Sequence, residues 1–339
     1  MEKLLPQNDT YRTAIAPVPA DISRPLWSVM IPTYNCASYL RETLCSVLAQ
    51  DPGPEVMQIE VVDDFSTRDD PAAVVAEVGR GRVAFHRQPE NVGHCRNFNT
   101  CLQRSHGRLI HLLHGDDCVR EGFYRKLERA FSTRHDIGAA FCRYMSMDEN
   151  GNWQTISPLE QLESGLLPDW LEKIATGQRL QPPSIAVRRE VYERLGGFDE
   201  RISSYGEDWE MWVRIAAQYS VWYEVEPLAL YRIHKSSLTG NTIRTGENAR
   251  DLRQVIEINR AHLPEEHVQS WTNRARLSFA LACLRRARRM LDAGDDQGFL
   301  AQTLEALKTS HSISVIVQAV LLVARRTWRM FIPKRARVL

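Results

Sequence analysis

The most informative stretch of this chain is Leu109-Ile110-His111-Leu112-Leu113-His114-Gly115-Asp116-Asp117. An apolar run is followed at once by two acids, and residues 120–131 then have the spacing of a helix. Ligands of open α/β sheets bind outside the carboxyl ends of the strands, which is where this acid pair falls. A carboxylate pair there suits a hard divalent cation beside phosphate oxygens. The alternative is an ordinary Asp-rich turn that caps the next helix.

Short apolar runs alternate with helix-like segments on the N-terminal side of this stretch. The alternation predicts parallel βαβ units in an α/β fold, with a sheet that helices cover on both faces. A second acid pair, Asp63-Asp64, also ends a predicted strand, so both pairs are expected at one edge of the sheet. The predicted strands are 27–32, 59–64, 83–86 and 109–113, and the predicted helices are 38–50, 74–78 and 93–104.

Beyond residue 131 the predicted elements are less regularly spaced. They are strands over 137–147, 182–188, 221–225 and 228–233, a hairpin turn over 148–152 and a helix over 207–218. From about residue 245 the spacing of apolar residues predicts helices up to the end of the chain.

The composition is that of an ordinary globular protein, without an electrostatic case for nucleic acid. The chain has 339 residues, of which 43% are hydrophobic and 25% charged, and its formal net charge is +1. Its seven cysteines contain no C-x-x-C pair, which argues against a zinc site and a disulfide framework. The N-terminus lacks the apolar core of a signal peptide, and no apolar run reaches the ~18 residues of a spanning helix. We therefore expect a cytoplasmic protein with reduced thiols.

Seven short motifs follow one another along the chain. They are Ser28-Val29-Met30-Ile31-Pro32-Thr33-Tyr34-Asn35, Val61-Val62-Asp63-Asp64-Phe65-Ser66-Thr67, Asn91-Val92-Gly93 with Arg96-Asn97, His114-Gly115-Asp116-Asp117, Gly196-Gly197-Phe198-Asp199-Glu200, Gly206-Glu207-Asp208-Trp209 and Tyr231-Arg232-Ile233-His234. In this order they resemble the inverting family 2 glycosyltransferases with the GT-A fold. The motifs G-x-G-x-x-G and G-x-x-x-x-G-K-[ST] are absent, so neither a dehydrogenase-type dinucleotide site nor a P-loop is supported.

The resemblance implies a mostly parallel GT-A sheet flanked by helices, with a Rossmann-like nucleotide-binding half. It implies a catalytic domain over residues 26–240, in which 26–118 bind the nucleotide and 119–240 bind the acceptor. Residues 1–25 are polar and punctuated by proline, which predicts a loosely ordered lead-in. Residues 241–339 are a helical extension outside the resemblance.

The resemblance assigns the nucleotide to the loops after the first two strands. Pro32, Tyr34 and Asp64 match positions against the base, where a carboxylate accepts a hydrogen bond from a ring N–H and an aromatic ring stacks. The alternative for Asp64 is a turn-forming role before Ser66. The further nucleotide-binding matches are Arg96, His114, Gly115 and Arg232. For Arg96, a solvated helix face is an equally good interpretation.

Asp116 matches the family's metal-binding acid, and His234 matches a histidine that in several relatives completes the metal shell or touches the pyrophosphate. Mn²⁺ or Mg²⁺ held there would bridge the two phosphates of the donor and neutralise the departing nucleotide. The usual motif has an acid where this chain has His114, so one carboxylate is missing and tight metal binding is less secure. The imidazole is left to hydrogen-bond a ribose hydroxyl. Asp117 is expected to support the metal shell or to cap the next helix.

Asp208 matches the family's catalytic base. Inversion by direct displacement needs one carboxylate that takes the proton of the acceptor hydroxyl as it attacks the anomeric carbon. Glu207 stands beside it and is expected to orient the acceptor. The alternative is that both acids only favour a helix N-terminus.

The implied reaction is transfer of a sugar, with inversion, from a nucleotide-diphosphate donor that we expect to be a UDP-sugar. The expected acceptor is a glycan or lipid-linked glycan of cell-surface polysaccharide synthesis. Two alternatives stay open. A nucleotidyltransferase would need a Gly- and Lys/Arg-rich phosphate loop near the first strand, which residues 32–36 do not supply. A non-catalytic member that binds a nucleotide sugar or glycan is favoured by His114 and disfavoured by the intact Glu207-Asp208.

The end of the chain joins an apolar run to basic residues. Residues 313–324 are apolar but too short to span a bilayer, and no acid follows Glu305. Trp328 and Phe331 stand among cations, which suits peripheral contact with an anionic membrane. The alternative is a helix packed on the catalytic domain, with a frayed basic tail. The basic residues are Arg325, Arg326, Arg329, Lys334, Arg335 and Arg337.

Overall fold

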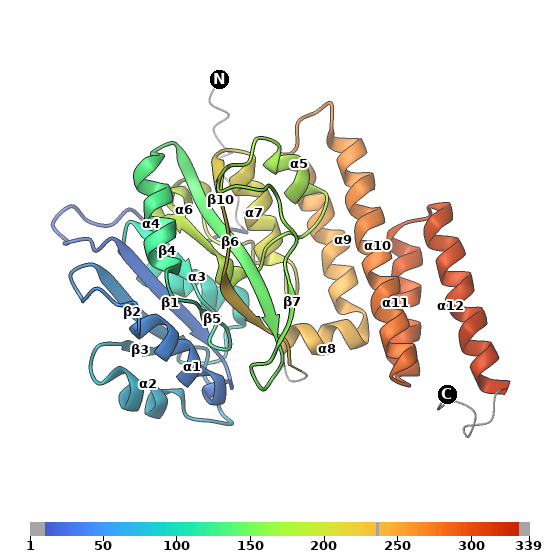
Figure 1. The fold of residues 1–339 in the computed structure, drawn as a ribbon, viewed down its shortest axis with the longest axis horizontal. Coiled ribbons are helices and arrows are strands. Elements are labelled where there is room, and N and C mark those ends of the chain that lie inside the picture. Colours follow the sequence, from blue (N-terminus) through green and yellow to red (C-terminus); the bar gives the residue numbers. More distant parts are fainter. Residues whose placement is uncertain (1–10, 235–236, 332–339) are drawn as a thin grey trace. The chain divides into compact units, whose positions relative to one another are not determined.

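The computed structural model describes residues 11–234 and 237–331, which fold into two compact units (Figure 1). The first unit comprises the described residues up to 174, together with 179–203 and 207–234, and the second comprises 175–178, 204–206 and the described residues from 237 onward. All of the predicted site residues lie in the first unit.

A mixed, mostly parallel sheet runs through the first unit (Figure 1). Its main path is β3-β2-β1-β4-β9-β6-β10-β5, with β7 beside β6 and β8 beside β10. Strands β1 to β4 are parallel, as the sequence predicts, and β9 is antiparallel to both β4 and β6. The strands are β1 (Trp27–Thr33), β2 (Met57–Asp63), β3 (Ala84–Arg87), β4 (Leu109–Leu112), β5 (Cys118–Val119), β6 (Ile137–Met147), β7 (Trp153–Ile156), β8 (Gly165–Leu166), β9 (Ile185–Arg188) and β10 (Ser220–Arg232).

Helices pack on this sheet because each has one apolar face. In α1 (Ala37–Leu48) the buried residues Leu40, Leu44 and Val47 recur at the three- and four-residue spacing of a helix face. They share one core cluster with Val29 of β1 and other strand residues. The other helices here are α2 (Pro71–Gly79), α3 (His94–Arg104), α4 (Phe123–Thr133), α5 (Trp170–Ala175), α6 (Arg189–Leu195) and α7 (Glu207–Ala216).

Strand β10 is continuous, although the sequence predicts separate strands over 221–225 and 228–233. The prediction is wrong because Pro227 cannot donate to the sheet's hydrogen-bond ladder and so resembles a break. The strand instead continues past it with register shifts between Glu224 and Ala229. Such bulges let a strand absorb an unpaired residue without ending.

Of the predictions for residues 148–152 and 182–188, the first is confirmed and the second is too long. The hairpin turn over 148–152 is confirmed, since the N–H of Asp148 donates to the carbonyl of Asn152 at 3.0 Å and β7 pairs antiparallel with β6. The strand predicted over 182–188 is shorter, because its first residues form a 3-10 turn (Pro182–Ser184) and β9 follows it. Proline favours such a turn because its φ is fixed.

Residues 11–16 are held on the first unit, whereas the sequence predicts a loosely ordered lead-in over the first 25 residues. Arg12 donates to Glu210 of α7 at 2.9 Å, across 198 positions of sequence. The carbonyl of Thr13 accepts a hydrogen bond from the N–H of Gly197 at 2.8 Å. The prediction fails for this segment because all its partners are distant in sequence.

The second unit is helical, as the sequence predicts, but its first helix begins before residue 245. The helices are α8 (Leu238–Thr245), α9 (Glu247–Asn259), the 3-10 turn η2 (Arg260–His262), α10 (Val268–Asp292), α11 (Asp296–Thr309) and α12 (Ile313–Phe331). A core cluster that includes Ala280, Cys283, Ala306 and Val315 joins α10, α11 and α12. Among the described residues, no helix has the length and apolar character to cross a membrane. The predicted peripheral contact with a membrane stays a prediction, and Lys334, Arg335 and Arg337 lie outside the described residues.

Candidate active site

The loop after β4 approaches the end of β1 through a close backbone contact. The N–H of Gly115 donates to the carbonyl of Pro32 at 3.0 Å. A Cβ added to Gly115 would lie 3.0 Å from Oγ1 of Thr33, so a side chain there would force the two segments apart. Gly115 and Pro32 thereby bring the acids that follow to the edge where β1 and β4 end.

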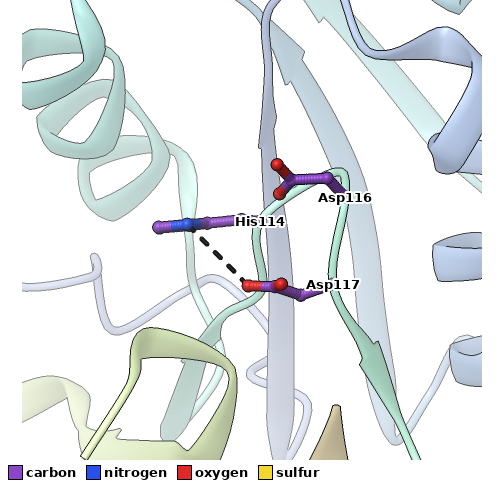
Figure 2. A group of neighbouring side chains, drawn as sticks. All are labelled: His114, Asp116 and Asp117. Atoms are coloured by element: carbon purple, nitrogen blue, oxygen red, sulfur yellow. Dashed lines mark ion pairs between the residues drawn. The ribbon is translucent and has the colours of Figure 1, made fainter. Parts of the chain in front are cut away.

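Three side chains of this loop gather their ligand atoms in a small volume. The candidate ligand atoms of His114, Asp116 and Asp117 all lie within 4.8 Å of one another (Figure 2). Oδ2 of Asp117 and Nε2 of His114 are buried and have no hydrogen-bond partner in the described part of the chain. Orphaned buried polar atoms are rare and call for a partner. Two carboxylates with one imidazole fit a divalent cation.

The surroundings of Asp116 and Asp117 shift the pKa values of the two carboxyls in opposite directions. Burial raises the pKa of Asp117 well above its usual range, and the neighbouring Asp116 raises it further. Burial also opposes ionisation of Asp116, but the hydrogen bond from His234 and the proximity of His114 outweigh it and lower this pKa. Burial lowers the pKa of His114, so its imidazole is neutral at pH 7 and can offer a lone pair. Asp116 is therefore the acid that carries the negative charge.

Arg232 fastens the acid loop to β10. Its backbone N–H donates to Oδ1 of Asp117, and its Nε donates to the carbonyl of Asp116, both at 2.8 Å. Its Nη2 donates to Glu42 of α1 at 2.5 Å, and its guanidinium lies over the ring of Tyr39. The structure thus shows a buried Arg232 that positions both acids. The predicted contact with a phosphate stays a prediction.

The loops after β1 and β2 interlock at the same edge of the sheet. The side-chain oxygen of Asn35 accepts hydrogen bonds from the N–H groups of Thr67 and Arg68, each at 2.9 Å. Asn35 has a φ of 51°, a conformation that Asn tolerates better than most residues. Its neighbour Tyr34 is 47% exposed, so the ring has a face open to a ligand.

Asp64 holds the loop that leads into α3. Its two carboxylate oxygens accept the N–H groups of Val92 and Gly93 at 2.8 and 3.0 Å. The residue is only 3% exposed, and burial raises the pKa of its carboxyl while these two hydrogen bonds oppose the rise. The structure therefore shows a loop-forming role for Asp64, and its predicted contact with the base stays a prediction.

Glu207 and His94 form a buried ion pair between the first residues of α7 and α3. Oε1 of Glu207 lies 3.4 Å from Nε2 of His94. Burial disfavours both charges, but their mutual attraction outweighs it, raising the pKa of His94 and lowering that of Glu207. Asp208 and Asp64 also favour the charged imidazole. The sequence prediction misses His94, because nothing in its local pattern links it to an acid on a distant helix.

Asp208 and His114 line the same small pocket. Phe98 of α3 supports the imidazole of His114, with ring centres 5.0 Å apart and planes inclined by 25°. The structure therefore brings the predicted catalytic base and the acid loop to one place. The other residues of the pocket are Leu112, Pro182, Ile185, Tyr192, Phe198 and Trp212.

Arg96 is not among the residues that line this pocket. Its Nε donates to Oε2 of Glu200 at 3.0 Å, and 66% of its side chain is exposed. Exposed ion pairs of this kind contribute little to stability. The observed geometry is that of a solvated helix face, and the predicted nucleotide contact of Arg96 stays untested.

Comparisons with known proteins agree with this architecture. The family model described as Glycosyl transferase family 2 matches residues 28–196. An uncharacterized protein of Mycobacterium tuberculosis is 29% identical over 245 residues, which cover 69% of this chain and 75% of that protein. The putative teichuronic acid biosynthesis glycosyltransferase TuaG of Bacillus subtilis is 26% identical over 255 residues, covering 69% of this chain and 89% of the relative.

Solved structures share the fold. S. aureus TarS in complex with UDP-GlcNAc matches with a TM-score of 0.59 and 16% identity, covering 83% of this chain and 91% of that chain. The mannosyltransferase PcManGT from Pyrobaculum calidifontis, in complex with GDP-Man and Mn²⁺, matches with a TM-score of 0.56 and 18% identity, covering 95% and 84%. With its ordered motifs, its sheet and its family match, the chain belongs to glycosyl transferase family 2.

Proposed function

We propose that this protein is an inverting glycosyltransferase that moves a sugar from a UDP-sugar to a glycan or lipid-linked glycan in cell-surface polysaccharide synthesis. The observation that carries the proposal is that Asp208 and His114 line one pocket. An acid suited to accept a proton thereby lies near the loop whose acids suit a diphosphate and its cation. The name of TuaG supports the acceptor class, and the UDP-GlcNAc complex of TarS supports the donor.

On the donor side, Asp116, Asp117, His114 and His234 would hold Mn²⁺ or Mg²⁺. When bound, the cation neutralises the diphosphate and the charge that develops on the leaving nucleotide. The Mn²⁺ complex of the mannosyltransferase supports this assignment. The exposed ring of Tyr34 is available to stack on the base.

On the acceptor side, Asp208 takes the proton of the attacking hydroxyl. The hydroxyl oxygen bonds to the anomeric carbon as the bond from that carbon to the donor phosphate breaks, and attack from the opposite face inverts the configuration. Glu207 pairs with His94, which favours Asp208 as the base. We assign the ion pair to fixing the start of α7, which sets the direction of the Asp208 carboxylate.

The test is a screen of nucleotide sugars for thermal stabilisation, with Mn²⁺ and with EDTA. A ligand at about 100 times its Kd should stabilise the folded protein by about 2.7 kcal/mol. We expect this stabilisation from a UDP-sugar with Mn²⁺, and loss of it with EDTA. No response to any nucleotide sugar would contradict the donor assignment.

Release of UDP in the presence of acceptor extracts separates the enzyme from a non-catalytic binding protein. The enzyme releases UDP when donor, Mn²⁺ and acceptor are all present. A protein that is stabilised by the donor but releases no UDP with any acceptor preparation would favour the non-catalytic alternative.

A further inference from the structure

Trp212 carries a buried polar atom that has no partner within the described part of the protein. The residue belongs to α7 and is 3% exposed. Its Nε1–H finds no hydrogen-bond acceptor among the described residues. A buried tryptophan ordinarily pairs this group, as Trp209 of the same helix does by donating to the carbonyl of Ile174 at 2.6 Å. The unpaired indole N–H of Trp212 therefore calls for a partner from outside the chain.

The indole lies beside the acid that we assign as the catalytic base. Asp208 and Trp212 are one helical turn apart on α7, so they share a face of the helix. A helical side chain leans toward the N-terminus of its helix, which directs Trp212 to the turn that carries Asp208. Both residues line the pocket that also contains His114. Because Asp208 and His114 are partly exposed and Trp212 is buried, the indole forms the inner part of this pocket.

The pocket joins the two sides of the proposed reaction. His114 belongs to the loop whose acids suit a diphosphate and its cation, and Asp208 suits the acceptor hydroxyl. In a direct displacement, the transferred sugar is the part of the substrates that lies between the leaving phosphate and the attacking oxygen. The rest of the lining is mostly aliphatic and aromatic. In a lining of this kind, a single buried donor fixes the orientation of a ligand.

We propose that the indole N–H of Trp212 donates a hydrogen bond to an oxygen of the transferred sugar, a hydroxyl or an amide carbonyl. The inference rests on the proposed function, because it names a contact of the donor within the same site. The contact also selects the donor. A sugar that carries only hydrogen at this position leaves the N–H unpaired, and sites built around such a polar contact discriminate strongly against ligands that lack the group.

The test compares two tryptophans of α7. Trp212→Phe keeps an aromatic ring and removes the unpaired N–H. Trp209→Phe is the matched control, because it removes a buried indole N–H that is already paired with Ile174. The probes are UDP alone and UDP-GlcNAc, UDP-glucose, UDP-galactose and UDP-glucuronate, each with Mn²⁺, and calorimetry gives the Kd of each.

The expected result is a loss that is specific to the sugar. Trp212→Phe should bind the UDP-sugar that wild type prefers about tenfold more weakly, which is ~1.4 kcal/mol, and should bind UDP alone with the wild-type Kd. Trp209→Phe should melt at a lower temperature, because the carbonyl of Ile174 loses its donor, but should keep the wild-type ratio of the two Kd values.

The indole N–H signals in a proton–nitrogen NMR spectrum give a second measurement on the full-length wild-type protein. The chain has eight tryptophans, and the signal that is missing from Trp212→Phe identifies Trp212. If this variant does not fold, Trp212→Tyr gives the same assignment. We expect the signal to shift when the preferred UDP-sugar is added and to stay in place with UDP alone.

Three results would overturn the proposal. The first is a Trp212→Phe variant whose affinities for the UDP-sugar and for UDP are both unchanged or fall equally. The second is the same sugar-specific loss in Trp209→Phe, which would assign the effect to α7 and not to the N–H. The third is an indole signal that the UDP-sugar leaves in place, which would leave a buried water as the partner. A wild-type protein that binds neither UDP nor any of these UDP-sugars contradicts the proposed function instead.

Discussion

Nε2 of His234 lies 3.0 Å from Oδ2 of Asp116, although 118 positions of sequence separate the two residues. Asp116 follows β4, and His234 follows β10. Both strands end at the same edge of the sheet, because β9 is antiparallel to β4 and β6, and β6 is parallel to β10. The contact keeps Asp116 ionised and so defines which carboxylate of the acid pair is ready for a cation.

Asp116→Ala should remove the metal dependence of donor binding, because the ionised carboxylate is lost. The measurement is UDP affinity by calorimetry over a titration of Mn²⁺. Asp136→Ala is the control, since Asp136 is an exposed acid outside the site. If the two variants respond equally to Mn²⁺, Asp116 is not a metal ligand.

Asp208→Asn should lower turnover by about 10²–10⁴-fold and leave the Kd of the donor unchanged. The amide keeps the size of the side chain but cannot take the proton of the acceptor hydroxyl. Steady-state UDP release gives the turnover, and thermal shift gives the Kd. Wild-type turnover in this variant would show that the base lies elsewhere.

His94→Gln should destabilise the protein in a pH-dependent way. The raised pKa of His94 means that its contribution is fully present below about pH 6.5 and is lost as the pH rises through the raised value. The lowered pKa of Glu207 means that its contribution is present above about pH 4.5 and is lost as the pH falls further. The loss of melting temperature should therefore be largest between these values and smaller at about pH 9.

His135→Gln is the matched control for this series, because His135 is exposed. A loss of melting temperature in His94→Gln that is the same at every pH would argue against a charged pair. If the control loses as much melting temperature with the same pH dependence, the effect cannot be assigned to His94.

Arg232→Gln should cost much more stability than Arg96→Gln. The first variant removes the hydrogen bond from a buried guanidinium to the carbonyl of Asp116, and leaving a buried acceptor unsatisfied costs about 1–3 kcal/mol. The second removes an exposed ion pair, worth about 0–1 kcal/mol. Urea unfolding of both variants compares them directly. Similar midpoints would mean that Arg232 does not hold the loop in solution.

The sequence predicts the first half of the sheet well because buried parallel strands are short runs of apolar residues. The acid pairs could be placed at one edge for the same reason, since parallel strands end together. Pro227 shows the limit of such patterns: it has the local signature of a break, but the neighbouring strands keep β10 continuous.

The contacts within the candidate site could not be predicted from the sequence, because they depend on how elements that are distant in sequence pack together. The sequence around Asp64 does not reveal that its carboxylate oxygens accept hydrogen bonds from the N–H groups of Val92 and Gly93. The ion pair of His94 with Glu207 needs the starts of α3 and α7 to meet. Residue types at helix starts say which chemistry is available, and only the packing of the helices says which pairs form.

The segment 11–16 has a consequence for how the first unit folds. Arg12 is made early, but its partner Glu210 is added to the chain 198 positions later. Contacts that close so long a loop cost chain entropy and form late. We therefore expect the contact of Arg12 with α7, the helix that begins with Glu207 and Asp208, to form in the last stage of folding. A chain that ends before residue 210 lacks this contact, and one that ends before residue 232 also lacks the contacts of Arg232 and His234 with Asp116.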